Sequence, residues 1–232
     1  MKKSIDEHAA RFDEAADSYD EDKSAEYEAC AGLVVEHARG SAESALPRAR
    51  PLRPDDVVLD LGTGTGAIAL ALASDAGRVV GRDISDGMLS QAREKATEAG
   101  VDNVEFGHGT FRDPEYDGPV DVVVSNFAMH HLADDEKRGA IDVVAALGPR
   151  RIVLGDVMFF GEPDPADPFY SPEVDDPATV GVLVDAFTDA DYAVTAVEMV
   201  HEQVGVIVAD NLRADEASEE GFADEPVGMN ED

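Results

Sequence analysis

Residues 57–73, VVLDLGTGTGAIALALA, join an apolar run to an alanine-rich run through three glycines. The apolar run predicts a buried strand at 57–61, and the alanine-rich run predicts a helix at 66–74. Glycine allows positive φ angles and a close approach of the backbone to a ligand, and the start of a helix favours negative charge. The stretch therefore predicts a strand, a ligand-binding turn and a helix in direct succession.

The glycine turn fits two classes of adenosine-containing cofactor. Gly62, Gly64 and Ala67 follow the G-x-G-x-x-G/A pattern of a dinucleotide site. Gly62, Gly64 and Gly66, placed behind Asp60, fit a site for S-adenosylmethionine (SAM) instead. A glycine loop also occurs in tight strand-to-helix turns that bind nothing, so residues elsewhere in the chain must decide.

The charge of the chain is extreme for its size. Its 232 residues, enough for one ordinary domain, include 51 acidic and 18 basic residues and carry a net charge of −33. Because the acidic residues are spread along the whole length, they indicate a surface adapted to a high-salt cytoplasm, where the Debye length falls to roughly 3 Å at 1 M. A binding protein for a basic partner is the alternative. We expect no nucleic-acid partner, since phosphate contacts need a basic stripe.

Cysteine content and hydropathy bear on the compartment. Cys30 is the only cysteine, which excludes a disulfide framework and a thiolate metal site, and we expect no bound metal. No apolar run reaches the length of a membrane span, and the opening residues lack the apolar centre of a signal peptide. We expect a soluble, cytoplasmic protein that is either a monomer or a homodimer.

Predicted strands and helices alternate along the chain after two opening helices, which are expected at 5–19 and 24–39. This alternation is typical of a parallel sheet with helices on both faces. The strands are expected at 57–61, 78–82, 103–107, 120–125 and 151–157, and the later helices at 86–99, 134–147 and 178–189.

The last two predicted strands, 192–200 and 204–210, break this alternation because only three residues separate them. Three residues cannot carry a parallel crossover, so these strands are expected to form an antiparallel hairpin. The chain then divides into a helical cap and linker at 1–50, a cofactor-binding domain at 51–212 and an acidic, disordered tail at 213–232.

Asp83 ends the second predicted strand, 21 residues after Gly62. Open α/β sheets bind ligands beyond the carboxyl ends of their strands, and a carboxylate at this place accepts hydrogen bonds from ribose hydroxyls. Asp83 could instead cap the following helix, a role for which Ser85 competes. The glycine loop and the acidic residue together favour the ribose role.

Other strand ends add side chains to the same edge of the sheet. Thr110 and Phe111 follow the third strand, where an adenine ring would lie, and Asn126 and Phe127 follow the fourth, near a reacting centre. Aromatic residues after the fifth strand could form a lid or simply pack against the sheet edge; they are Phe159, Phe160, Phe169 and Tyr170.

In this order and spacing the motifs resemble those of the class I SAM-dependent methyltransferases, from about residue 8 to residue 210. VLDLGTGTG resembles the family's first motif, GRDISDGML the acidic second, and VVVSNFAMHHL the fourth-strand motif. The opening RFDEAADSYD is similar to the entry segment of small-molecule methyltransferases, among them quinone-biosynthesis enzymes and uncharacterised bacterial enzymes. The antiparallel terminal hairpin fits this family better than a dehydrogenase, which favours SAM over a dinucleotide.

The resemblance implies a Rossmann-like, seven-stranded sheet in the order 3-2-1-4-5-7-6, with the last strand antiparallel, helices on both faces and an N-terminal helical cap. The sequence departs from the family at Thr110, where aspartate is common, and at LGPRR (147–151), where P-G-G is common. The residues that the resemblance assigns to SAM are Asp60, Gly62, Thr63, Gly64, Gly66, Asp83, Ile84, Thr110, Phe111, Asn126, Phe127 and Tyr19.

The opening helix is expected to close over the cofactor. Phe12 and Tyr19 lie seven residues apart and therefore on one helix face. In similar methyltransferases a tyrosine near this junction approaches the bound SAM, which implies that Tyr19 shields the methyl group from water. The alternative is that both rings only pack on the domain.

His130 and His131 follow the fourth strand and are the candidate general bases, because an oxygen or nitrogen nucleophile must lose a proton. The pair could instead cap the next helix or shape the pocket. The proline-rich motif of amine methyltransferases is missing at 125–128, so we expect a small-molecule acceptor that is methylated on carbon, oxygen or sulfur. The alternative is a non-catalytic, regulatory or structural SAM-binding protein of the same fold.

Overall fold

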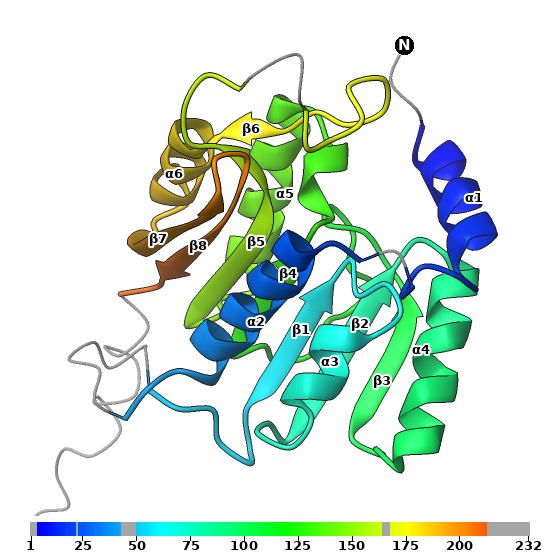
Figure 1. Cartoon of the computed structure of the whole chain (residues 1–232). Helices are drawn as coiled ribbons and strands as arrows, with labels where there is room; N and C mark the ends of the chain where they lie inside the picture. The colour runs from blue at the N-terminus through cyan, green and yellow to red at the C-terminus, as the bar shows by residue number, and fades with distance from the viewer. Residues whose placement is uncertain (1–3, 22, 43–49, 164–167, 213–232) are drawn as a thin grey trace, which may run out of the picture.

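A mostly parallel sheet forms the centre of the computed structural model, which describes residues 4–21, 23–42, 50–163 and 168–212 (Figure 1). The tail that was predicted to be disordered, 213–232, lies outside the described residues. Within these ranges no helix is long and apolar enough to span a membrane. The strands are β1 (Val57–Leu61), β2 (Arg78–Asp83), β3 (Val104–His108), β4 (Val122–Asn126), β5 (Arg151–Phe159), β6 (Ala178–Thr179), β7 (Ala193–His201) and β8 (Val204–Asp210).

The order of the strands along the sheet is β3-β2-β1-β4-β5-β8-β7. β1 to β5 pair in parallel, whereas β8 runs antiparallel to both β5 and β7. The predicted order with its reversed last strand is therefore confirmed. The sequence missed only β6, a two-residue strand that pairs with β5 off this path and shifts the numbering of the hairpin by one.

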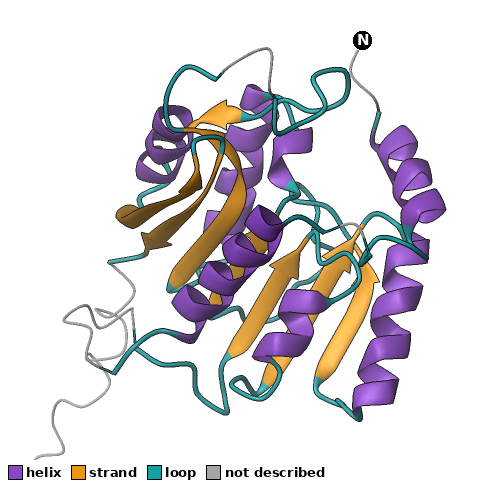
Figure 2. Ribbon diagram, in the orientation of Figure 1, coloured by secondary structure: helices purple, strands orange, loops and turns teal. Residues whose placement is uncertain are grey.

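Helices cover both faces of the sheet (Figure 2). Apolar residues of α2, α3 and α4 pack in one core cluster, and those of α5 and α6 pack in the other. Strand β4 shows why, since Val122 and Val124 belong to the first cluster and Val123 to the second, as the two-residue period of a strand requires. The helices are α1 (Ile5–Ala15), α2 (Ala25–Arg39), α3 (Ala67–Leu72), α4 (Asp86–Ala99), α5 (Asp134–Ala146) and α6 (Val180–Asp189).

The two opening helices have different places in the fold. α1 starts at a capping box between Ser4 and Glu7, ends at Ala15 rather than at the predicted residue 19, and contacts α4. α2 packs on β4 and β5, and its Cys30 and Val34 are fully buried in the core. Figure 1 shows α1 standing beyond the carboxyl ends of the strands, above α4. α1 and the turn after it therefore lie over the end of the sheet, whereas most of α2 lies in the core.

Candidate functional site

The carboxyl ends of the parallel strands open on a cavity of about 280 Å3, which α1 covers. Ten of the fourteen residues that the sequence assigned to the site line this cavity. Asp60, Thr63, Gly66 and His130 do not. The ten are Tyr19, Gly62, Gly64, Asp83, Ile84, Thr110, Phe111, Asn126, Phe127 and His131.

The glycine loop presents bare backbone to the cavity. Gly62 has a φ of +71°, and a side-chain carbon added there would lie 2.3 Å from the Cβ of Ala128, so no other residue fits. Gly64 has a φ of +53°, and nothing within 4 Å would meet an added carbon. Both conformations favour glycine, and they leave room for a ligand against the main chain.

Asp83 links this loop to the start of α4. Its carboxylate accepts the Gly64 N–H at 2.8 Å and the Ser85 N–H at 3.0 Å. Burial raises the pKa of Asp83, although these N–H groups oppose the rise. Ser85, and not Asp83, caps α4, because its hydroxyl accepts the Met88 N–H. The carboxylate thus stays on the cavity wall with acceptor capacity left for a ligand.

Asp60 organises the loop from behind. It is buried, and its carboxylate accepts the Thr63 hydroxyl at 2.7 Å. Burial and the neighbouring charge of Asp83 raise the pKa of Asp60 to about 7, against the effect of the Thr63 hydrogen bond. Gly66 takes the left-handed conformation that starts α3. These three residues shape the turn rather than line the cavity.

Thr110 lines the cavity but uses its hydroxyl oxygen locally. Thr110 Oγ1 accepts the N–H groups of Arg112 at 3.2 Å and Asp113 at 2.9 Å, which closes the turn after β3. The hydroxyl hydrogen remains for another acceptor. Phe111, the next residue, lines the cavity and packs against the core cluster under α5 and α6.

Asn126 and Phe127 end β4 in an unusual geometry. Both amide atoms of Asn126 are buried and make no hydrogen bond of standard geometry with a described residue, although the Tyr27 hydroxyl approaches the amide. Phe127 has a φ of +54°, and its ring lies 5.0 Å from that of Tyr27. Left-handed backbone in a bulky residue is costly and clusters at functional sites, and a buried amide without a hydrogen bond of standard geometry also needs an explanation.

The turn after α1 is tied to the glycine loop and to α4. Asp20 accepts the Thr65 hydroxyl at 2.8 Å and also pairs with Lys95 of α4. Tyr19 lines the cavity, and burial together with the charge of Asp83 raises the pKa of its hydroxyl. Phe12 of α1 meets Tyr19 edge to face at 6.4 Å. The cap therefore brings two aromatic rings to the cavity.

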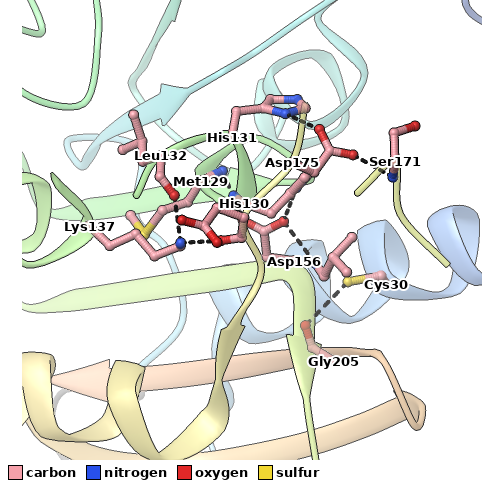
Figure 3. A network of polar contacts seen from close by, with 12 residues as sticks. Cys30, Met129, His130, His131, Leu132, Lys137, Asp156, Ser171, Asp175 and Gly205 are labelled. Atoms are coloured by element: carbon pink, nitrogen blue, oxygen red, sulfur yellow. Dashed lines mark hydrogen bonds and ion pairs between the residues drawn. The ribbon is translucent and has the colours of Figure 1, made fainter. Parts of the chain in front are cut away.

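The two candidate bases have separate surroundings (Figure 3). His130 lies behind the cavity wall, where its Nδ1 is 2.5 Å from Asp156 Oδ1. Asp156 also accepts the N–H groups of Met129 and His130. His130 thus connects the turn after β4 to Asp156 of β5.

His131 lines the cavity, and its Nδ1 is 2.8 Å from Asp175 Oδ1. Asp175 is oriented by the Ser171 N–H at 2.8 Å. Burial lowers the pKa of His131 to about 4, with a further contribution from His130. Burial raises the pKa of Asp175, but the hydrogen bonds from His131 and the Ser171 N–H and the charges of the two histidines together lower it to about 2. A neutral imidazole therefore stands beside a carboxylate at neutral pH.

His130, His131 and Asp175 offer ligand atoms within 4.8 Å of one another, a spacing that a metal ion could use. The two histidine–carboxylate hydrogen bonds account for this cluster without an ion.

Sequence patterns missed several residues of the site, among them two that line the cavity with polar rings and one carboxylate. Tyr27 and His8 line the cavity from α2 and α1, and Asp175 reaches His131 from 44 residues further along the chain. Tyr27 lay within the helix predicted at 24–39 but was given no role, and neither His8 nor Asp175 belongs to a recognisable motif. The four aromatics that were predicted to form a lid or to pack against the sheet edge do not line the cavity. Phe159, the last residue of β5, contacts Tyr170, and Phe169 contacts Phe127.

The sheet order and the glycine loop define a Rossmann-like protein that binds an adenosine-containing cofactor. Residues 58–148 match the Methyltransferase domain family. An uncharacterized methyltransferase of Bacillus pumilus is 32% identical over 66% of this chain and 68% of its own length. This chain therefore belongs to the class I SAM-dependent methyltransferases, and its fold is the SAM-binding fold of that family.

Other similarities cover less or are more distant. An uncharacterized methyltransferase of Staphylococcus carnosus is 33% identical over 45% of this chain and 49% of its own length. The chain thus spans about half the length of the first curated relatives it matches. The structure of a DhpI–SAM–HEP complex superposes with a TM-score of 0.66 at 22% identity, covering 88% of this chain and 96% of that one, which is a likeness of fold.

Proposed function

We propose that this protein transfers the methyl group of SAM to a carbon, oxygen or sulfur atom of a small-molecule acceptor. One observation carries the proposal: a single cavity joins the glycine loop and Asp83 to an aromatic end that α1 covers. A cavity of about 280 Å3 beneath a helix suits a small molecule better than a protein or nucleic-acid strand. The net charge of −33 also disfavours a nucleic-acid acceptor.

The residues present fit the cofactor. Gly62 and Gly64 allow its close approach to the main chain, and Asp83 has acceptor capacity for the two ribose hydroxyls. Asn126 offers a buried amide whose described neighbour is the Tyr27 hydroxyl and which makes no hydrogen bond of standard geometry. The amide therefore has hydrogen-bonding capacity left for a bound cofactor.

When bound, SAM supplies a methyl group on a positively charged sulfur. The chain contributes alignment of the acceptor with that methyl and exclusion of water. Phe12, Tyr19 and Phe127 surround the cavity with aromatic surface. Orientation in such a site can contribute up to about 7–11 kcal/mol to the rate.

The test combines binding and transfer. Calorimetry with S-adenosylhomocysteine (SAH) in molar KCl should show binding, and methyl-labelled SAM incubated with a small-molecule extract should yield a labelled product that an Asp83→Ala variant makes poorly. SAH binding without any labelled product would favour the non-catalytic alternative. Absence of SAH binding would contradict the cofactor assignment as well.

A further inference from the structure

We propose that His131 and Asp175 form a base dyad that directs methyl transfer to the hydroxyl oxygen of an apolar or aromatic compound. This inference rests on the proposed function and narrows its three possible acceptor atoms to one. It assigns different roles to the neighbouring histidines, since His131 acts on the acceptor and His130 supports the turn. Asp175 is the positioning residue of the dyad.

The orientation of the His131 ring follows from its contacts. Nδ1 is 2.8 Å from Asp175 Oδ1, and a carboxylate only accepts, so the proton of the neutral ring lies on Nδ1. Nε2 is then the acceptor nitrogen, and it makes no hydrogen bond within the described part of the chain. Because the ring lines the cavity, Nε2 is available to a ligand there. Figure 3 shows the ring held from one side by Asp175.

Four residues determine whether the ring carries a charge. The rings of His8, His130 and Phe12 lie 4.9, 4.0 and 5.4 Å from His131 by their centroids, and within the described residues its carboxylate partner is Asp175. Crowding by two other imidazoles and an apolar ring disfavours the imidazolium form before reaction. Asp175 stabilises that form once a proton arrives.

The dyad discriminates among acceptor atoms through hydrogen bonding. A hydroxyl donates a strong hydrogen bond to a neutral imidazole nitrogen, a thiol donates a weak one, and a carbon–hydrogen bond donates almost none. Apolar side chains, among them Phe12 and Leu132, line the cavity together with His131. Arg112 and Glu136 carry charges and also line the cavity, but they form an ion pair with each other at 3.3 Å. An uncharged compound with an apolar or aromatic body and a hydroxyl group fits these surroundings.

The step balances as follows. The hydroxyl oxygen forms the new bond to the methyl carbon while the carbon–sulfur bond breaks, and its electron pair stays on sulfur, which becomes neutral. The hydroxyl proton passes to His131 Nε2, and Asp175 stabilises the resulting imidazolium. The proton then leaves to solvent. General-base assistance of this kind contributes about 10²–10⁴ to the rate.

Methyl transfer from 13C-methyl SAM tests the assignment, with phenol and catechol as hydroxyl probes, thiophenol as the thiol probe and acetylacetone as the carbon probe. The 13C shift of the transferred methyl identifies the atom that received it. We expect O-methyl products, a fall in kcat of about 100-fold or more for His131→Gln, and unchanged SAH affinity. His37→Gln is the matched control, because His37 pairs with Glu198 of β7 and does not line the cavity, so this variant should retain full activity.

Ring 15N spectra of the wild-type protein provide a readout that needs neither activity nor a variant. We expect neutral His131 with its proton on Nδ1 at pH 7, and Asp175→Asn should disturb this tautomer. Transfer to sulfur or carbon, no transfer to the hydroxyl probes, full kcat in His131→Gln, or a proton on Nε2 would each overturn the dyad. Loss of SAH binding by the wild-type protein would instead contradict the proposed function.

Discussion

Asp13 of α1 caps the start of α4 through Ser85. Asp13 Oδ1 accepts the Ser85 hydroxyl at 2.6 Å and the Gly87 N–H at 2.9 Å. These two hydrogen bonds hold the pKa of Asp13 below its usual value. Ser85 also donates its N–H to Asp83. The turn that starts α4 therefore contacts both α1 and the carboxylate that is assigned to the cofactor. Movement of α1 and ligand binding should therefore be coupled.

Replacing Asp13 tests this coupling. Asp13→Ala removes two hydrogen bonds worth about 1 kcal/mol each, so α1 should open more often. We expect faster proteolytic cleavage within residues 4–21 and about threefold to tenfold weaker SAH binding, whereas SAH should protect the wild-type segment. Glu14→Ala is the matched control, because Glu14 is an exposed acidic residue of the same helix. Equal cleavage of the wild-type protein with and without SAH would remove support for a closing cap.

Asp83 should dominate cofactor affinity. Asp83→Ala removes the acceptor for the ribose hydroxyls and also frees the Gly64 N–H, so SAH binding should weaken about 10-fold to 100-fold at molar KCl. Asp83→Asn keeps one oxygen acceptor and should lose less. Calorimetry on both variants decides, and an Asp83→Ala protein that binds as well as wild type would remove Asp83 from the site.

Much of the fold could be predicted because its signals are local. The period of apolar residues placed β1 at 57–61 and β8 at 204–210, and both ranges are confirmed. The short connection between the last two strands, three residues in the predicted ranges and two between β7 and β8, predicted the reversed strand from chain geometry alone. The sequence did not predict short elements or exact helix ends, such as the end of α1 at Ala15 and the two-residue strand β6.

The candidate site was only partly predictable, because contacts across the chain decide it. The sequence could not rank His130 against His131, whose surroundings come from Asp156 on β5 and Asp175 in the loop before β6. Asp60 stood in the right motif, yet burial behind the loop separates it from the cavity. Motif spacing locates the edge of the sheet, whereas side-chain packing decides which member of a motif meets a ligand.

Asp60 gives the protein a pH-dependent stability. Its folded-state pKa of about 7 lies above the usual value for an aspartate, so the folded protein binds this proton more tightly than the unfolded chain does. The free energy of unfolding should therefore fall as the pH rises from about 4 to about 7. Asp60→Asn cannot ionise, and its advantage over wild type should grow across that range to at most about 4 kcal/mol.

Urea denaturation of wild type and Asp60→Asn at several pH values measures this difference. Asn keeps an oxygen that can accept the Thr63 hydroxyl, so the loop should retain its shape. The control is Asp55→Asn, which changes an exposed carboxylate. A constant difference between wild type and Asp60→Asn from pH 4 to pH 8 would show that Asp60 ionises normally.

Salt should stabilise this protein, because its net charge of −33 makes the folded state repel itself. Surface pairs such as Arg78–Glu105 weaken as salt is added, but exposed pairs contribute only about 0–1 kcal/mol each. The screening of repulsion among the acidic residues should therefore outweigh the weakening of these ion pairs. We expect the Tm to rise by at least about 5 °C between dilute buffer and 1 M KCl.

A charge-reversal variant separates screening from other effects of salt. Glu94 and Glu98 are exposed on α4, and replacing both with lysine raises the net charge by four units without touching the core. The double variant should melt higher than wild type in dilute buffer, and its Tm should depend less on KCl. Sucrose, which does not screen charge, should not reproduce the difference between the two proteins. A wild-type Tm that stays flat or falls as KCl is added would contradict adaptation to high salt.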